Sequence, residues 1–445
     1  MGIRWRDLRP VLLRRRPTRY QGRFIRGTLV GRQTGMNNGF MTIKNHQNNV
    51  VLNEFNPSDP HVFQRALAHF NVERLAAEPN LNAGAPIAAV SSAGAQGHPR
   101  CSVLERMPKW LICVPLTVQW LWLALCYRNA MLPSAANPAI TSGGLVGEGK
   151  LEYFSGMGPV ARAVTAAYCA VSTHRPLTVV ELQKLLCSAG LSWPLIAKPD
   201  LGLCGYGVRL LADVSELQAY LSAFPVNEVV VLQQYLPAEG EAGIFYARDP
   251  DSGRGRIIGL ALRYFPRVTG DGKSSLATLI AADPRAARLM KSSKHEPRYN
   301  AAAVPASGEV VRLSTIGSTR VGGLYRDGRA CITAALTQAV DVIARDMPTF
   351  YFGRFDVRFD SLQDLSAGRG FTIMEVNGAG SEAIQAWDPD TSVLAGFKII
   401  FEKQRILFAI GHAMRKKGVK PIGLLTLMRL NRRQQRLIAG YPPSN

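Results

Sequence analysis

The chain is short of acidic residues, and the shortage lies at its two ends. It has 32 Asp and Glu against 53 Lys and Arg among 445 residues, a formal net charge of +21. Residues 1–110 carry 16 basic and 6 acidic side chains, and residues 398–445 carry 11 and 1. Basic ends indicate contact with a polyanion, such as an anionic membrane surface, or serve only as solvated flanks. Because zinc-finger spacing and an aromatic RNA-binding signature are missing, we expect no specific nucleic-acid recognition.

Cysteine motifs and an apolar leader are also missing. The seven cysteines are scattered, odd in number, and never form a CxxC pair. This usage argues against a disulfide framework and against a structural zinc site. The strongly charged first residues predict no secretory signal peptide. These absences predict a cytoplasmic protein, with peripheral contact to the inner face of a membrane left open.

Composition divides the chain into four parts. Its length suffices for two or three domains, and 47% hydrophobic with 19% charged residues is typical of a globular protein. We predict a basic, partly low-complexity N-terminal extension over 1–105 and a hydrophobic segment with the region before the core over 106–180. The core follows over 181–395, and a basic helical tail over 396–445.

One long apolar run, WLICVPLTVQWLWLALCY, covers residues 110–127 without a charge. Its length is at the lower limit for crossing a bilayer, and its Trp and Tyr residues suit a membrane interface. Arg106 and Lys109 flank one end and Arg128 the other, while a proline and a glutamine interrupt the run. A buried helix or helical hairpin, an interfacial helix and a transmembrane span all stay open.

Short β-rich runs alternate with helical patterns from residue 178 onward. The runs rich in β-formers cover 194–199, 228–236, 242–248, 256–265, 351–359 and 370–377. The helical patterns cover 178–189, 215–224, 275–282 and 331–345. Strands and helices in this mixture predict an α/β or α+β fold with sheets covered by helices.

A lysine at the end of a predicted strand leads into a glycine-rich loop. The strand WPLIAKP contains Lys198, and the loop after it contains Gly202, Gly205 and Gly207. Glycines let a backbone close tightly around phosphate oxygens, and a lysine neutralises phosphate charge. The spacing matches neither the Walker motif nor G-x-G-x-x-G, so an ordinary hairpin is the alternative interpretation.

Two further strands place acidic and amide side chains on one face. In YFGRFDVRF, alternation puts Arg354, Asp356 and Arg358 together, and in FTIMEVNG it puts Glu375 beside Asn377. Two carboxylates and an amide form an oxygen-only ligand set, which Mg²⁺ prefers when it also holds nucleotide phosphates. The arginines suit a phosphoryl group in transfer. The alternative is a pair of edge strands with solvated polar faces.

The order of these pieces resembles the ATP-grasp superfamily, in particular D-alanine–D-alanine ligase-like and related carboxylate–amine ligases. The resemblance covers roughly residues 137–389. It implies an α/β (α+β) ATP-grasp fold in which two α+β lobes sandwich ATP, between a basic N-terminal extension and a basic helical C-terminal tail. It also implies an ADP-forming ligase that uses ATP and Mg²⁺ (or Mn²⁺) and joins a carboxylate to an amine through an acyl phosphate.

The resemblance assigns the nucleotide site to particular residues. Lys150 and Lys198, which are 48 residues apart, would contact ATP together with Gly205 and Gly207. Glu241 would bind the ribose hydroxyls. The hinge that lines the adenine would be formed by Gln233, Gln234, Tyr235 and Leu236.

The metal ligands implied by the resemblance are Asp356, Glu375 and Asn377. Arg354 would steady the acyl phosphate, and Lys273 would be a further phosphate contact. Closing loops at 291–312 and 314–323 would cover the reaction, and Arg320 in the second would touch substrate.

The sequence also departs from the family. Gln233 stands where many relatives have Glu, the glycine-rich loop contains Cys204 and Tyr206, and no D-alanine-binding motif is found. The two substrates therefore do not follow from the resemblance. We hypothesise that residues 136–150, with Asn137 and Glu148, line the substrate end of the cleft. An ATP-dependent phosphotransferase and a non-catalytic nucleotide-binding scaffold are the alternative functions.

Overall fold

The computed structural model describes residues 41–45, 48–52, 101–291 and 294–445. The chain divides into two compact units, 1–59 and 60–445. In the first, strands β1 (Met41–Asn45) and β2 (Asn48–Leu52) form an antiparallel hairpin. Most of the predicted N-terminal extension lies outside the described residues.

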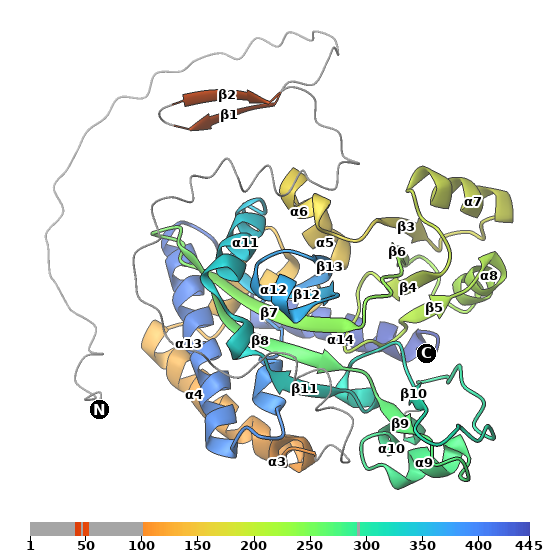
Figure 1. Cartoon of the computed structure of the whole chain (residues 1–445). Helices are drawn as coiled ribbons and strands as arrows, with labels where there is room; N and C mark the ends of the chain where they lie inside the picture. Colours follow the sequence, from red (N-terminus) through yellow and green to blue (C-terminus); the bar gives the residue numbers. More distant parts are fainter. Residues whose placement is uncertain (1–40, 46–47, 53–100, 292–293) are drawn as a thin grey trace, which may run out of the picture. The chain divides into compact units, whose positions relative to one another are not determined.

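The second unit is organised around a five-stranded antiparallel sheet in the order β11–β8–β7–β12–β13 (Figure 1). Alternate side chains of its strands point to opposite faces. On one face Ile244 and Tyr246 join the buried Val340 and Ile343 of helix α11 (Ala334–Arg345). The strands are β7 (Gly240–Arg248), β8 (Gly255–Tyr264), β11 (Leu324–Asp327), β12 (Phe352–Phe359) and β13 (Phe371–Asn377).

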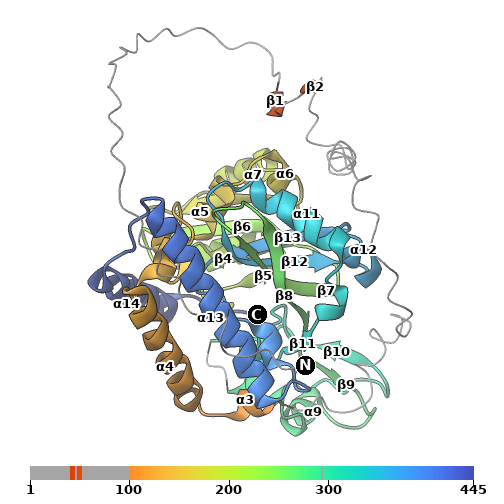
Figure 2. The same ribbon diagram turned by 90° about the vertical axis from the view of Figure 1, so that its left-hand side faces the viewer.

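One long helix and several short ones cover the rest of this sheet. A long helix, α13 (Val393–Lys416), packs on the opposite side from α11 through Leu407 and Ile410, which meet Phe352 of β12 (Figure 2). The remaining short helices around the sheet are α5 (Lys150–Ser155), α6 (Pro159–Ala163), α12 (Leu362–Ser366), η2 (Leu132–Ala135), η3 (Thr141–Gly144), η5 (Arg329–Cys331) and η6 (Ile384–Trp387).

A four-stranded antiparallel sheet forms a second lobe, in the order β3–β6–β4–β5. Its strands are β3 (Tyr168–Ser172), β4 (Leu195–Pro199), β5 (Arg209–Leu211) and β6 (Val229–Gln234). Helices α7 (Val179–Ser188) and α8 (Val214–Ser222) supply Leu182 and Leu217 to its core. The C-terminal helix α14 (Leu424–Gly440) adds Ile438 to the same core.

A small subdomain extends from the end of β8. Strands β9 (Arg267–Thr269) and β10 (Val310–Arg312) pair antiparallel and pack on α9 (Leu276–Ala282), α10 (Ala287–Met290) and η4 (Thr319–Val321). The predicted closing segment at 291–312 is therefore folded into this subdomain where it is described.

The apolar run forms helix α4 (Lys109–Tyr127), preceded by the one-turn helix α3 (Val103–Arg106). Among the described residues, α4 is the helix long and apolar enough to cross a bilayer, and 11% of its apolar window is buried. Of the three alternatives left open for this run, a helix buried in the protein does not fit this exposure. Among the described residues, α4 packs mainly beside α13 (Figures 1 and 2).

The α+β fold prediction is confirmed, and each predicted β-run from 194 to 377 contains a strand. Strands β3, β5, β9, β10 and β11 were not predicted, because three to five residues without clear alternation carry little signal. The residues of the predicted basic tail are helical, but α14 packs in the core of the second lobe rather than standing apart. The four-part division of the chain stays a prediction.

Candidate functional site

A pocket of about 290 Å³ lies between the two sheets. The smaller sheet contributes β4 and β6 to its walls, and the larger sheet contributes β7, β8, β12 and β13. The glycine-rich loop after β4 and the loop at 314–318 also line it. Twelve of the predicted site residues meet here: Lys150, Lys198, Gly205, Gln233, Gln234, Tyr235, Leu236, Glu241, Arg354, Asp356, Glu375 and Asn377.

The two predicted ATP lysines lie close together at the floor of the pocket. Lys150 begins α5, and its Nζ is 3.2 Å from Glu375 Oε1. Lys198 Nζ donates to the Gln233 side chain at 2.7 Å and to the Met374 carbonyl at 2.9 Å. Burial lowers the pKa of Lys198 to about 8, although the nearby Glu375 favours its charged form. The pocket therefore places two lysine ammonium groups beside one carboxylate, Glu375.

The acidic and amide residues meet across paired strands. In the register of β12 with β13, Asp356 lies opposite Glu375, and Arg354 lies opposite Asn377. Arg354 binds Asp356 in a two-pronged ion pair of 2.5 and 2.9 Å, and Arg263 adds a third contact at 3.3 Å. Burial disfavours ionisation of Asp356, but the two arginines outweigh it and hold its pKa below the ordinary value. The pocket thus keeps this carboxylate charged.

The same strands bring together the three predicted metal ligands, two carboxylates and an amide. Asn377 donates its amide nitrogen to Asp356 at 3.2 Å, which leaves its oxygen as the ligand atom. Two carboxylates directly opposite each other repel unless cations lie between them. Within residues 101–291 and 294–445, no group of three or more His, Cys, Asp and Glu is suited to a metal ion. Nucleotide phosphates would therefore have to complete the coordination of Mg²⁺ by Asp356, Glu375 and Asn377.

The predicted adenine hinge lies at the end of β6. The main chain of Gln233 and Gln234 is engaged in the ladders with β3 and β4. Tyr235 and Leu236 follow the last ladder position and also line the pocket. A base that pairs with main chain here would therefore meet Tyr235 and Leu236 first.

Glu241, the predicted ribose ligand, lines the pocket but is nearly buried. Its carboxylate is 2.9 Å from Arg263 and 3.4 Å from Arg358. Both arginines come from neighbouring strands, β8 and β12. To accept a hydrogen bond from a ribose hydroxyl, the Glu241 carboxylate would have to keep these ion pairs at the same time. Its role in ribose binding stays a prediction.

The glycine-rich loop closes one side of the pocket. Gly205 has a φ of 75°, a left-handed conformation that favours glycine, and it faces the pocket. Gly207 does not line the pocket, contrary to its predicted phosphate contact. A side chain there would strike Pro199, and its carbonyl accepts a hydrogen bond from Tyr220 at 2.7 Å. Gly207 therefore shapes the turn.

Lys273 and Arg320 also lie outside the pocket, so the structure does not bring these predicted catalytic residues to it. Lys273 is exposed in the turn between β9 and α9, a region whose tight turn is closed by Asp271. Arg320 donates to the carbonyls of Cys204 and Gly205 at 3.2 and 3.3 Å. The guanidinium thus braces the glycine-rich loop from behind.

The segment at 136–150 reaches the pocket with one of its two candidate residues and not with the other. Asn137 is fully buried and hydrogen-bonds the main chain of β12 at Phe352 on both its nitrogen and its oxygen, so its predicted place at the substrate end is wrong. Glu148 does line the pocket. One of its carboxylate oxygens is buried without a hydrogen-bond partner, and burial raises its pKa to about 7. The hydroxyl of Ser381, another pocket residue, is likewise buried and unpartnered.

Three residues near the site were not predicted from the sequence. Arg263 of β8 binds both Glu241 and Asp356. Gln434 of α14 lines the pocket and donates to the Gly202 carbonyl at 3.1 Å. Lys403 of α13 donates to the Ser381 carbonyl, and burial lowers its pKa to about 8. Only Arg263 had a signal, because a charge interrupts the apolar run of β8.

Comparison with known proteins gives distant structural similarity. No family model matches the chain, and no curated protein matches it. A bifunctional glutathione synthetase from Pasteurella multocida aligns at 15% identity with a TM-score of 0.30, over 57% of this chain and 36% of that one. The chain therefore spans about a third of that protein's length.

Two further solved structures give similar values. The D-alanine–D-alanine ligase from Bacillus anthracis aligns at 14% identity and a TM-score of 0.34, over 65% of this chain and 72% of that one. The ADP complex of PurK, N5-carboxyaminoimidazole ribonucleotide synthetase, aligns at 14% and 0.30, over 60% and 54%. TM-scores of this size leave function to be inferred from the residues of the pocket.

Proposed function

We propose that this chain is an ATP- and Mg²⁺-dependent ligase of the ATP-grasp kind that joins a carboxylate to an amine. The observation that carries the proposal is the meeting, in one pocket between two antiparallel sheets, of two lysines and an oxygen-only ligand set. Lys150 and Lys198 lie beside Glu375, Asp356 lies opposite Glu375 on the paired strand, and Asn377 lies two residues after Glu375 on its own strand.

The reaction would proceed in two steps. First, a substrate carboxylate oxygen attacks the γ-phosphorus of ATP, the bond to the β–γ bridging oxygen breaks, and ADP leaves. The amine then attacks the acyl carbon of the acyl phosphate, inorganic phosphate leaves, and the nitrogen loses a proton. Mg²⁺, held by Asp356, Glu375 and Asn377, would offset the negative charge of the phosphates.

The chain's own residues supply charge and exclude water. The ammonium groups of Lys150 and Lys198 would bind phosphate oxygens without needing to move, since their positions are already set by Glu375 and Gln233. Arg354, held by its ion pair with Asp356, would face the acyl phosphate. The glycine-rich loop would limit hydrolysis by covering the phosphates.

The amine is the substrate for which Glu148 is suited. Its carboxylate has an unpartnered oxygen in the pocket, and Ser381 offers a second unpartnered polar atom there. A buried carboxylate oxygen without a hydrogen bond is costly, and an ammonium ligand would relieve that cost. We therefore place the amine of the second substrate beside Glu148.

The test is a screen of amino acids and dipeptides for ADP release by the purified protein, with hydroxylamine added as a trap. A ligase that forms an acyl phosphate yields a hydroxamate from its carboxylate substrate. Glu375→Ala should lower turnover by at least about a hundredfold, as removal of a group that stabilises transferring charge does. Glu402→Ala, an exposed change on α13, is the matched control.

Two outcomes would replace the proposal. ATP consumption without a hydroxamate for any carboxylate would indicate a phosphotransferase on the same fold. Turnover that is unchanged in Glu375→Ala would point to a non-catalytic nucleotide-binding scaffold.

A further inference from the structure

Helix α4 has two apolar faces, and the residues that the structure describes leave one of them exposed. Ile112 and Leu123 are each 6% exposed and face the body of the protein. At 3.6 residues per turn, the exposed large side chains of the helix fall within a sector of roughly 120° on the other side. They are Trp110, Leu111, Val114, Val118, Leu121, Trp122 and Leu125, with exposures from 42 to 75%. We call this sector the α4 apolar face.

The covered side of α4 is fastened to α13 by packing and by polar contacts. Gln119 donates its side-chain amide to the Phe401 carbonyl at 2.7 Å. About two turns before the end of the helix, the ring of Trp120 meets Phe408 edge-on with centroids 4.9 Å apart. The two helices therefore lie side by side (Figures 1 and 2).

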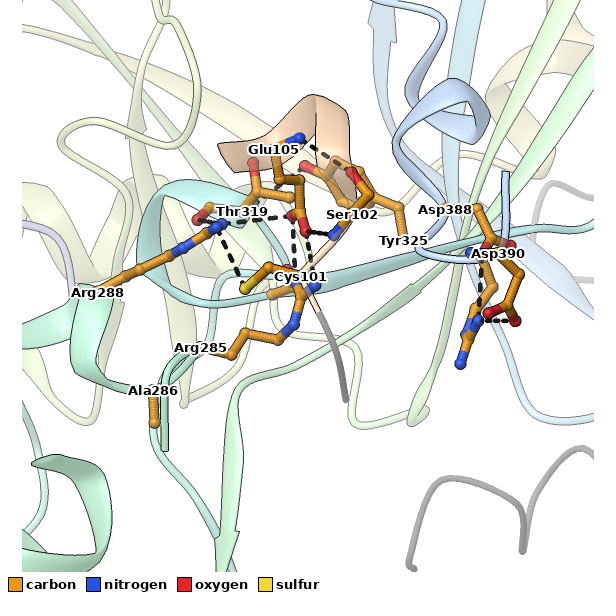
Figure 3. A network of polar contacts seen from close by, with 12 residues as sticks. Cys101, Ser102, Glu105, Arg285, Ala286, Arg288, Thr319, Tyr325, Asp388 and Asp390 are labelled. Carbon is orange, nitrogen blue, oxygen red and sulfur yellow. Dashed lines mark hydrogen bonds and ion pairs between the residues drawn. The ribbon is translucent and has the colours of Figure 1, made fainter. Parts of the chain in front are cut away.

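The N-terminal end of α4 is fixed by its neighbour α3. Glu105 of α3 has a 3% exposed side chain, which is 2.7 Å from Arg285 and 3.3 Å from Arg288 of the small subdomain (Figure 3). A transmembrane orientation of α4 would remove it from both anchorages. Contact with a bilayer through the α4 apolar face alone keeps them intact.

The charges around the α4 apolar face are basic. Arg106 is exposed just before the helix, Lys109 at its first position and Arg128 just after it. The sequence has no acidic residue between Glu105 and Glu148. Positive charges at both ends of an apolar sector complement the headgroups of anionic lipids.

The aromatic residues of the face are also placed as a membrane surface requires. Trp110 lies at the start of the helix and Trp122 near its end, both more than 60% exposed. Indole rings favour the level of the headgroups, where one end is apolar and the other hydrated. We propose that α4 lies in the plane of an anionic bilayer, with its apolar face among the acyl chains and its flanking basic residues on the headgroups.

A second copy of the chain fits the face less well. A two-fold interface through α4 is self-complementary, so each end of one helix meets an end of the other. Lys109 and Arg128 are the end residues, and either parallel or antiparallel pairing sets positive charge against positive charge. An anionic bilayer, by contrast, offers negative headgroups to the basic residues at both ends of the helix.

The test uses the full-length protein with vesicles of phosphatidylcholine, alone or mixed with phosphatidylserine. Co-sedimentation should be strong with the anionic vesicles and weaken as salt is raised. Trp110→Ser with Trp122→Ser should lower the affinity by at least about tenfold, since two large apolar side chains lose their burial. Lys109→Glu with Arg128→Glu should lower the affinity for anionic vesicles by about tenfold or more and reduce the salt dependence.

A matched control changes exposed apolar residues elsewhere. Val180→Ser with Val226→Ser removes two side chains that are 57% and 69% exposed in the second lobe, and it should leave vesicle binding unchanged. Full sedimentation of the tryptophan variant, or no sedimentation of the unaltered protein, would overturn the proposal. So would a dimer that the tryptophan changes convert to a monomer. ADP release measured without lipid tests the ligase proposal separately.

Discussion

At the scale of single residues, the pocket is a balance of buried charges. Glu375 is disfavoured as an anion by burial, but Lys150 and Lys198 outweigh that effect and hold its pKa below the ordinary value. Burial also disfavours the charged form of Asp356, and Arg354 and Arg263 outweigh it and lower the pKa of that carboxyl. Each acid thus stays charged because basic side chains lie beside it, from its own strand or from neighbouring elements. Glu148 is the exception, since burial dominates and raises its pKa.

Glu148→Gln tests that exception with two measurements. The pKa of Glu148 is raised from 4.5 to about 7, so the folded state binds more protons than the unfolded state between these values. Stability from this group is therefore full below pH 4.5 and is lost as pH rises through 7. In urea titrations, the free energy of unfolding of Glu148→Gln, taken relative to that of the unaltered protein, should rise by up to about 3 kcal/mol between pH 4 and pH 8.

The same variant should raise the KM of the amine substrate by about tenfold at pH 8, because a charge-assisted hydrogen bond to the ammonium is lost. The KM of ATP should change little. Glu402→Gln, on the exposed surface of α13, is the control for both measurements. A parallel pH dependence of stability in the two variants would contradict the burial of Glu148 as an unpaired carboxyl.

At the scale of elements, the glycine-rich loop depends on partners distant in sequence. Arg320 of η4 holds its carbonyls, and its guanidinium lies 4.3 Å from the ring centroid of Tyr206. Gln434 of α14 holds the Gly202 carbonyl, and Tyr441 donates to the Leu201 carbonyl at 2.7 Å. Glycine makes the tight turn possible, and these contacts restrict it to one conformation.

Arg320→Ala should therefore act on nucleotide binding more than on chemistry. Loss of two hydrogen bonds and a cation–π contact should raise the KM of ATP by about tenfold, with a smaller change in kcat. Steady-state kinetics with varied ATP measures both constants, and Arg254→Ala in the exposed β7–β8 turn is the control. A large fall in kcat at an unchanged KM would restore the predicted contact between Arg320 and substrate.

At the scale of the whole molecule, segments from both ends of the second unit hold its subdomains together. Residues 101–106 reach the small subdomain through the Glu105 ion pairs (Figure 3). Helix α14 packs against the smaller sheet, and α13 against the larger one. The regions flanking the predicted catalytic core are therefore structural parts of the molecule.

Glu105→Gln tests this organisation. It retains side-chain volume but removes the charge that Arg285 and Arg288 share, and breaking a buried ion pair should cost about 3 kcal/mol of unfolding free energy. Urea titration measures the loss. Glu181→Gln is the matched control, because Glu181 is also the third residue of a capped helix and pairs with an arginine, but on the surface. Its cost should be much smaller, and equal costs would argue against the anchoring role of Glu105.

The sequence by itself determined the local elements and part of the site. Alternation of polar and apolar residues predicted β12 and β13, and with them the shared face of Asp356, Glu375 and Asn377, because side chains of a strand alternate whatever it packs against. Lys198 was placed beside them only through the family resemblance. Its contacts with Gln233 and the Met374 carbonyl were visible only in the structure.

The tertiary structure alone decided which distant surfaces meet. Burial of Asn137, the bracing role of Arg320 and the pocket contact of Gln434 depend on partners that lie far away along the chain. The exposure of α4 was undecided for the same reason, since an apolar helix has the same sequence pattern whether protein or lipid covers it. Only the arrangement of α13 beside one face of α4 left the other face exposed among residues 101–291 and 294–445.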